Sequence, residues 1–503
     1  MENYCDDILD CESSAAYERS LFAGDPRAAL RAMDSAGRKT ARAILSEFGP
    51  ALGGAPEVLA LVGSGHNGGD AARAALEILE ALSGASISVF APGGFGAMKP
   101  NTAFFAGRLM SSCGRVREVG EGGFPGRCGL VLEGLAGMCF KPPMRGGMER
   151  AVALANSVQA RVKASIDLPA GVGDFPPSSA FRADVTYMTG IAKAAAFKPE
   201  NREFVGRLRY VDLGFFPEGA PRGERAVVSG RVLEPLRLLR RAETDKRSYG
   251  HLFIFAGSSN YPGAALMNAK AALRSGVGLV SAFVPERFAC QLAAAEPACI
   301  WIPCPEDESG GLSLETFSLF RGVCGAESAV LAGSGMGKSA ESAALVSEII
   351  KNTAAPVVLD ADAIRPSVLD AAPRDKILIT PHAGEFLRIS GGLSDADLSA
   401  MCRSRGVAAL LKGPFSRICD GGGIAFNVSG GPMLSRAGSG DVLAGLAAGF
   451  LARRDLGFSR FDAACAAARL LGCAAEKAFA ECGETAYATS DIFPFIKKAL
   501  ADD

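Results

Sequence analysis

The feature that most constrains the fold is a repeated unit, in which an apolar strand runs through a glycine-rich turn into a helix. The clearest copy begins with the apolar segment Glu57–Val62, which the glycine-rich segment 63–71 follows. A helical pattern at 72–82 and a second apolar segment at Ser86–Phe90 complete the unit. Strand, turn, helix and strand in this order predict a βαβ unit, whose strands are parallel.

The same alternation extends over both halves of the chain. Small and apolar residues recur with helical spacing over 26–48, which predicts a further helix. Further strands are predicted at Leu130–Glu133, Val162–Leu168, Val185–Thr189, Leu208–Leu213, His251–Ala256, Leu279–Val284, Ser328–Ala332, Val357–Asp360, Ile377–Thr380 and Val407–Lys412, with a hairpin over 416–428. We therefore expect an α/β fold of mainly parallel sheets, doubly wound in the N-terminal half, with ligands at the carboxyl ends of the strands.

The chain has 503 residues, which is too long for one ordinary hydrophobic core. The segment 217–225 is rich in proline, glycine and charge, as linkers between domains commonly are. We therefore predict two domains, at 1–221 and 226–503.

Composition excludes several classes of function. The net charge is −1 with no blocks of like charge, which argues against binding to nucleic acid or a membrane surface. The N-terminus lacks the pattern of a signal peptide, and the longest apolar run, Val442–Ala452, is too short to span a bilayer. The 14 cysteines form neither a CxxC pair nor a cluster with zinc spacing. We expect a cytoplasmic protein with buried, reduced thiols.

The segment 436–441, Arg-Ala-Gly-Ser-Gly-Asp, leads into a run of small and apolar residues that favours a helix. Such a turn leaves the backbone amides of Gly438, Ser439 and Gly440 free to bind a phosphate at the helix N-terminus. Asp441 would repel a phosphate, so we interpret it as a base that takes a proton from a hydroxyl while the amides hold a phosphoryl group. The alternative is that Asp441 only caps the helix.

Further polar residues follow predicted strands in the C-terminal half. They are the segments 333–337, 360–362 and 380–385 and the pair Lys412–Gly413. Each alone is explained equally well as a turn, a cap or a satisfied core group. Together they lie at the same edge of a parallel sheet, where Lys412 can point at nucleotide phosphates.

The N-terminal half has its own polar groups at strand ends. Asn67 and Asp70 lie in the glycine-rich segment, Glu133 ends a predicted strand, and Asp167 follows an apolar strand in the sequence Asp-Leu-Pro-Ala-Gly. A carboxylate held by such a turn can act on a ligand. The alternative for Asp167 is a capped loop without catalytic function.

Several of these motifs resemble the YjeF N-terminal family over about residues 15–215. GSGHNGGD, LVLEGLAG, the loop through Lys141–Pro143, IDLPAG and VDLG occur in the family's order. That family consists of NAD(P)H-hydrate epimerases with a Rossmann-like fold and a bound potassium ion. The resemblance implies that Asp167 is the acid/base at C6 of the damaged ring. It implies substrate contacts from His66, Asn67, Gly68, Gly69, Asp70, Gly137, Met138, Cys139, Phe140, Lys141, Pro142, Pro143 and Asp167, and potassium ligands from Asn67, Glu133 and Ala170.

The chain departs from the usual pattern of that family at four places. His66 and Ala71 alter the usual NNGGDG, Glu133 stands where aspartate is usual, and Ala170 stands where serine is usual. Since the usual aspartate and serine both supply potassium ligands, the metal site is the element most affected. A non-catalytic, nucleotide-binding N-terminal half is the alternative that these departures leave open.

The stretch 228–503 resembles the YjeF C-terminal family of the ribokinase-like superfamily. SYG, GAALMNAKAALRSGVGLV, GSGMG, VVLDADAI, TPHAGE, LLKG, AGSGDVLAG and ATSDI occur in order. That family consists of ADP- or ATP-dependent NAD(P)H-hydrate dehydratases. The resemblance implies hydrate contacts from Ala265, Gly335, His382 and Asp441, and nucleotide contacts from Lys412, Gly413, Pro414, Phe415, Ser416, Gly438, Ser439 and Gly440. Departures occur at Lys246–Arg247, Arg365, Ala437 and Leu471.

Together the two resemblances imply a bifunctional enzyme that repairs hydrated NAD(P)H. The expected co-substrate is ADP or ATP with Mg²⁺, the expected partners are small molecules only, and we expect a homo-oligomer. Asp441 would deprotonate the C6 hydroxyl, and the phosphorylated oxygen would then leave with push from the ring nitrogen. A small-molecule kinase is the alternative, because the same fold phosphorylates sugars and hydroxymethylpyrimidines.

Overall fold

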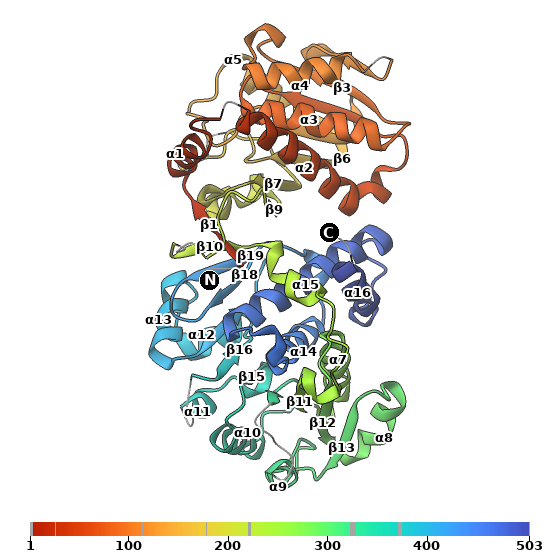
Figure 1. Cartoon of the computed structure of the whole chain (residues 1–503), viewed down its shortest axis with the longest axis vertical. Coiled ribbons are helices and arrows are strands. Elements are labelled where there is room, and N and C mark those ends of the chain that lie inside the picture. Colours follow the sequence, from red (N-terminus) through yellow and green to blue (C-terminus); the bar gives the residue numbers. More distant parts are fainter. Residues whose placement is uncertain are drawn as a thin grey trace. The chain divides into compact units, whose positions relative to one another are not determined.

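The computed structural model describes residues 4–25, 27–112, 114–177, 179–219, 223–321, 328–370 and 375–501. The chain forms two compact units (Figure 1). One comprises 6–220 with 479–481, and the other comprises 1–5, 221–478 and 482–503. The division at 220/221 falls within the segment 217–225 that the sequence indicates as a linker, of which 220–222 lie outside the described residues.

The N-terminal unit is built on a parallel sheet with the strand order β4-β3-β2-β5-β6-β7-β9. The order runs outward in both directions from β2 and β5, so the carboxyl ends of these two strands form the switch point at which such sheets bind ligands. The strands are β2 (Glu57–Val62), β3 (Ser86–Phe90), β4 (Val116–Glu118), β5 (Arg127–Gly134), β6 (Gln159–Ile166), β7 (Val185–Thr189) and β9 (Arg207–Val211).

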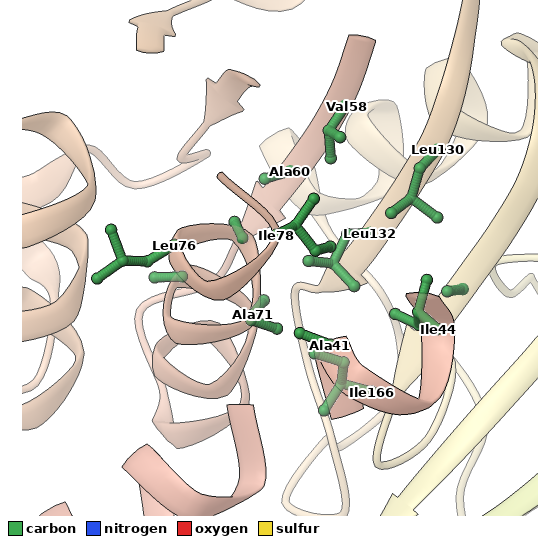
Figure 2. Close-up of a cluster of buried hydrophobic side chains, with 14 of the residues drawn as sticks. Ala41, Ile44, Val58, Ala60, Ala71, Leu76, Ile78, Leu130, Leu132 and Ile166 are labelled. Carbon is green, nitrogen blue, oxygen red and sulfur yellow. The ribbon is translucent and has the colours of Figure 1, made fainter. Parts of the chain in front are cut away.

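Helices cover both faces of this sheet, which is why its strands are apolar on both sides. Val58 and Ala60 face one core with Ile44 and Ile78, as Figure 2 shows, while Leu59 between them faces a second core. The helices are α1 (Cys11–Leu21), α2 (Ala28–Leu52), α3 (His66–Ala81), α4 (Pro100–Met110), α5 (Gly146–Ser157) and α6 (Arg202–Val205); a short parallel pair joins β1 (Cys5–Leu9) to β8 (Ala192–Lys193).

The prediction of a turn over 63–71 was wrong in its second half, because α3 begins at His66. The glycines there serve close packing inside the first helical turns. A Cβ at Gly68 would lie 1.9 Å from the carbonyl oxygen of Gly63, and one at Gly69 would lie 2.3 Å from the sulfur of Met33. The side chains of His66–Asp70 are therefore held by a helix that starts at the end of β2.

The C-terminal unit has a sheet with the order β13-β12-β11-β14-β15-β16-β17-β18-β19-β10. The strands from β13 to β17 are parallel, and the predicted hairpin is confirmed as the antiparallel pair β18 and β19. The strands are β10 (Arg225–Val228), β11 (His251–Phe255), β12 (Leu279–Pro285), β13 (Ile300–Cys304), β14 (Ser328–Ala332), β15 (Val357–Leu359), β16 (Ile377–Ile379), β17 (Ala408–Leu411), β18 (Ser416–Cys419) and β19 (Ile424–Asn427).

Its helices are α7 (Pro262–Arg274), α8 (Glu286–Ala295), α9 (Thr316–Arg321), α10 (Ala340–Asn352), α11 (Pro366–Leu369), α12 (Ala383–Ser390), α13 (Asp395–Arg405), α14 (Ser439–Ala452), α15 (Arg460–Cys482) and α16 (Phe493–Ala501). The small-residue run lies in α14, which packs closely on α7. A Cβ at Gly445 would lie 2.5 Å from the carbonyl oxygen of Asn268, and one at Gly449 would lie 2.2 Å from the hydroxyl of Ser275. Among the helices of the described ranges, none combines the length and apolar character needed to cross a membrane.

Candidate active sites

Polar side chains meet at the carboxyl ends of the adjacent strands β14, β15, β16 and β17. Asp360, after β15, is 1% exposed. Its Oδ1 accepts from the Lys412 ammonium at 2.9 Å and from the Thr380 hydroxyl at 2.7 Å, and its Oδ2 accepts from the Ser334 hydroxyl at 3.0 Å. Asp360 therefore fixes Lys412 in place rather than offering a free carboxylate to a ligand.

Asp441 lies at the third position of α14, close to this cluster. The N-cap is Gly438, in the left-handed conformation with φ = 87°, so the alternative reading of Asp441 as the N-cap was wrong. The Ser439 amide donates to the carbonyl of Arg436, whereas the amides of Gly440 and Asp441 have no hydrogen-bond partner among the described residues. Two backbone donors and the helix dipole are thus available to an anion.

Burial and the neighbouring charged groups set the pKa of Asp441. Burial raises the pKa of Asp441 to about 7 and the nearby Asp360 carboxylate adds to this, while the Lys412 ammonium and the Ser334 hydroxyl oppose it. Burial by itself would lower the pKa of Lys412, but the carboxylates of Asp360, Glu385 and Asp441 outweigh it and raise that pKa. A carboxyl group with a pKa near neutrality is suited to proton transfer.

Lys412 lies beside the start of α14, and His382 pairs with Lys412 through a single parallel bridge. A Cβ added to Gly440 would lie 3.1 Å from the Lys412 nitrogen, and the Lys412 amide donates to the carbonyl of Pro381 at 2.8 Å. His382 caps α12, since its Nδ1 accepts from the amides of Gly384 and Glu385. Its Nε2 lies 3.2 Å from Oε1 of Glu385, and 60% of the side chain is exposed.

The other residues near this site occupy different positions in the fold. Ala265 is fully buried on α7, and its predicted contact with the hydrate stays a prediction. Gly335, with φ = 63°, lies against α7, because a Cβ there would come 2.7 Å from the Cβ of Tyr261. The segment 413–416 joins β17 to β18 next to Lys412. Thr489 holds the loop before α14 by donating to the carbonyl of Ala437.

The second site is a cavity of about 440 Å³ at the carboxyl ends of β2 and β5. Most of the residues predicted to contact the substrate line it: His66, Asn67, Asp70, Gly137, Met138, Cys139, Phe140, Lys141, Pro143 and Asp167. Gly68, Gly69, Pro142, Glu133 and Ala170 do not line it. The side chains of Glu18, Lys99, Arg145 and Thr189 do line it, and the sequence reasoning missed all of these.

Asp167 is held by a buried lysine. It adopts a positive φ of 67°, which is rare for a residue other than glycine and is typical of functional sites. Its Oδ2 accepts from the Met138 amide at 3.0 Å, and its Oδ1 forms an ion pair with Lys193. Lys193 is 1% exposed and also donates to the carbonyl of Thr189 at 3.1 Å. Asp167 is therefore positioned by strands β6, β7 and β8.

Two more carboxyl groups face the same cavity. Burial raises the pKa of Glu18 to about 7, the Lys193 ammonium opposes this, and Asp167 adds to it. Burial, with Asp167 and Glu18 adding, raises the pKa of Asp70 well above its ordinary value. Carboxyl groups whose pKa values are raised by burial are suited to proton transfer in such a site.

Both halves of the chain match known families. Residues 252–498 match the family described as NAD(P)H-hydrate dehydratase, and residues 29–195 match the YjeF-related protein N-terminus. The bifunctional NAD(P)H-hydrate repair enzyme Nnr of Gloeobacter violaceus is 34% identical over 470 residues, which cover 87% of each chain. The chain belongs to the bifunctional NAD(P)H-hydrate repair enzyme family. The resemblances inferred from the motifs and the predicted fold class are thereby confirmed.

Two further proteins are similar to this chain. The repair enzyme Nnr of Pyrobaculum aerophilum is 29% identical over 498 residues, covering 95% of this chain and 94% of its own. A solved ADP/ATP-dependent NAD(P)H-hydrate dehydratase from Bacillus subtilis, co-crystallised with ATP/Mg²⁺, is 23% identical with a TM-score of 0.46, covering 54% of this chain and 96% of that chain.

Within this family, the departures at 133 and 170 contact each other. Glu133 is fully buried. Its Oε1 accepts from the Leu135 amide at 2.7 Å, and its Oε2 accepts from the Ser165 hydroxyl at 2.8 Å and from the Ala170 amide at 3.3 Å. Burial raises the pKa of Glu133 to about 7. The glutamate thus links the loop after β5 to the loop after β6 through hydrogen bonds alone.

Another departure, Arg365, ties two loops of the C-terminal site together. Its guanidinium donates to the carbonyls of Gly337 at 2.7 Å, Ser339 at 3.0 Å and Asp362 at 2.6 Å. The Asp362 carboxylate in turn accepts from the Gly337 amide at 3.0 Å. The loops after β14 and β15 are therefore held as one rigid rim of the site.

Proposed function

We propose that this chain epimerises hydrated NAD(P)H at C6 in its N-terminal unit and dehydrates the S form with ADP or ATP in its C-terminal unit. The dehydratase assignment rests on Asp441. This carboxyl group has a pKa near 7 and lies near Lys412 and two available backbone amides at the start of α14. Our predictions of a homo-oligomer and a cytoplasmic location stay predictions.

In the dehydratase, Asp441 takes the proton of the C6 hydroxyl, and the oxygen attacks the terminal phosphoryl group of the nucleotide, which releases AMP from ADP or ADP from ATP. Lys412 and the amides at the start of α14 stabilise the charge on the phosphoryl oxygens as it transfers. The C–O bond then breaks with the electron pair of the ring nitrogen, phosphate leaves, and loss of a proton from C5 restores the ring double bond. Phosphate is a far better leaving group than hydroxide, which explains the need for a nucleotide.

The resemblance also implies Mg²⁺. In the described part of the chain, no group of three or more His, Cys, Asp or Glu side chains is arranged to hold a metal ion, and Asp360 is occupied by protein donors. The residues present do not form a magnesium site of their own. We assign the ion to the nucleotide phosphates, whose charge it would neutralise.

A test of the overall function uses the full chain with S-hydrate and ADP or ATP. We expect the absorbance of the reduced nicotinamide to return as one phosphate is released for each hydrate consumed. A stable phosphorylated product without that absorbance would instead identify a kinase. Pure R-hydrate alone should lose its optical purity if the N-terminal unit is an epimerase.

The pH dependence of the dehydratase follows from Asp441. Its ionised form is the base, so kcat/KM should rise with pH through about 7. Asp360→Asn removes a charge that raises this pKa and should move the rise to lower pH, whereas Lys412→Met removes a charge that lowers it and should move the rise to higher pH. Rate profiles at constant ionic strength measure this. A rise that keeps its position in both variants would contradict the assignment.

The implied potassium ion fits this chain poorly. Asn67 suits a ligand, since both polar atoms of its amide are buried without a hydrogen-bond partner in the described structure. Glu133, however, accepts three protein donors, and Ala170 contributes an N–H rather than a hydroxyl. We assign potassium no step in the epimerisation and propose that Glu133 replaces it as the link between the two loops.

Thermal unfolding tests this replacement. A cation present at a hundred times its Kd stabilises a fold by about 2.7 kcal/mol, so a real potassium site would raise the Tm measurably. We expect KCl and choline chloride to give the same Tm for the N-terminal unit. In Glu133→Asp/Ala170→Ser, which restores the family's usual side chains, we expect KCl to raise the Tm. A potassium-dependent Tm in the unaltered chain would show that Glu133 still serves as a ligand.

A further inference from the structure

A second, smaller compartment of about 50 Å³ adjoins the epimerase cavity. Glu18, His66, Asp70 and Thr189 line both spaces and form the wall between them, whereas Asp167 lines only the larger one. Glu18 comes from α1, a different element from those that hold Asp167. Glu18 therefore lines the substrate cavity and the small compartment at the same time.

The small compartment can hold water along its polar side. Its far walls are apolar: Phe22, Ala29, Ala32, Met33, Ala36, Leu213 and Phe215. Its polar groups lie on the shared wall, with Asn101 beside them. Ordered water needs two to four polar partners, and this space is large enough to hold water next to Glu18.

Epimerisation at C6 requires chemistry on both faces of the ring. The C6 hydroxyl takes a proton and leaves as water from one face, while the electron pair of the ring nitrogen forms a C6=N iminium bond. A water molecule then adds to the other face and gives up a proton, which restores the carbinolamine with inverted configuration. An acid/base group held at one position serves one face, and a second group on the opposite side can serve the other, the two exchanging roles in the reverse direction.

We infer that Glu18 is the second acid/base group of the epimerase unit, acting opposite Asp167 on water held in the small compartment. This rests on the proposed epimerase function. Asp167, paired with Lys193, serves one face. Glu18 has no such ion pair among the described residues and adjoins the water space, so it serves the other face. Asp70, on the same wall, donates a hydrogen bond to the water in its protonated form.

The test compares Glu18→Gln with Glu12→Gln in the full chain. Glu12 is an exposed carboxylate on the same helix, so its replacement controls for any effect on α1. We expect Glu18→Gln to slow R-to-S epimerisation by about 10²-fold or more, with dehydratase turnover on pure S-hydrate unchanged, and Glu12→Gln to change neither rate. Equal epimerase rates in the two variants would overturn the inference.

Isotope transfer and a second variant separate catalysis from folding. In ¹⁸O-labelled water, each epimerisation by the unaltered chain should place one solvent oxygen at C6, and Glu18→Gln should slow labelling and epimerisation equally. Ala32→Val adds two methyl groups to the small compartment and should slow both while Glu18 remains. Epimerisation without labelling would overturn the inference alone. Loss of epimerisation in the unaltered chain would overturn the proposed function as well.

Discussion

Replacement of Asp441 by Asn is expected to lower dehydratase turnover by about 10²–10⁴-fold, the usual contribution of a positioned general base. The asparagine keeps the size of the side chain and its place in the first turn of α14, so the fold and the backbone amides are retained. It cannot accept the proton of the C6 hydroxyl. Initial rates with saturating S-hydrate and ADP measure the effect.

Nucleotide affinity separates this role from a structural one. Lys412 and the amides of Gly440 and Asp441 remain in Asp441→Asn, and one negative charge beside the phosphates is removed. The Kd for ADP, measured by calorimetry, should stay the same or become smaller. Glu308→Gln, a change of an exposed carboxylate in the same unit, should leave both turnover and Kd unaltered. Near-normal turnover in Asp441→Asn would refute the assignment of the base.

Much of the fold was predictable because local patterns determine it. Apolar strands that alternate with helical segments were found near their true positions, and parallel strands brought Ser334, Asp360, Thr380 and Lys412 to one edge of a sheet. Asp441 at the start of a helix followed from the turn before it. These inferences depend on periodicity and strand direction, which a single sequence carries.

The site residues that could not be inferred from the sequence are brought to the site by contacts between distant segments. Glu18 belongs to a helix that was not predicted, and nothing in its neighbourhood indicates a ligand. The start of α3 was misplaced because glycine in a helix was read as a turn, when close packing on Gly63 and Met33 requires it. Among these residues, only Lys193 could have been singled out from the sequence, because it is the one lysine in the segment of small and apolar residues 190–197.

The ion pair of Lys193 with Asp167 gives the largest expected effect on the N-terminal unit. Lys193→Met leaves Asp167 buried without its countercharge, and breaking such a pair by removing one partner costs about 3–5 kcal/mol. The Asp167 carboxylate also loses the ammonium group that holds it beside the substrate cavity. We expect epimerase activity to fall by at least about 10²-fold and the unit to unfold more easily.

A double variant distinguishes the electrostatic cause from simple loss of packing. Lys193→Met/Asp167→Asn removes both charges, so it should recover most of the free energy of unfolding while epimerase activity stays lost. Hydrogen exchange of peptides from β6 and β7 in urea reports the stability of this unit, and Lys39→Met, at an exposed lysine of α2, serves as the matched control. If the double variant is no more stable than Lys193→Met, the buried countercharge is not what Lys193 provides, and Asp167 must be held by its backbone and the Met138 amide instead.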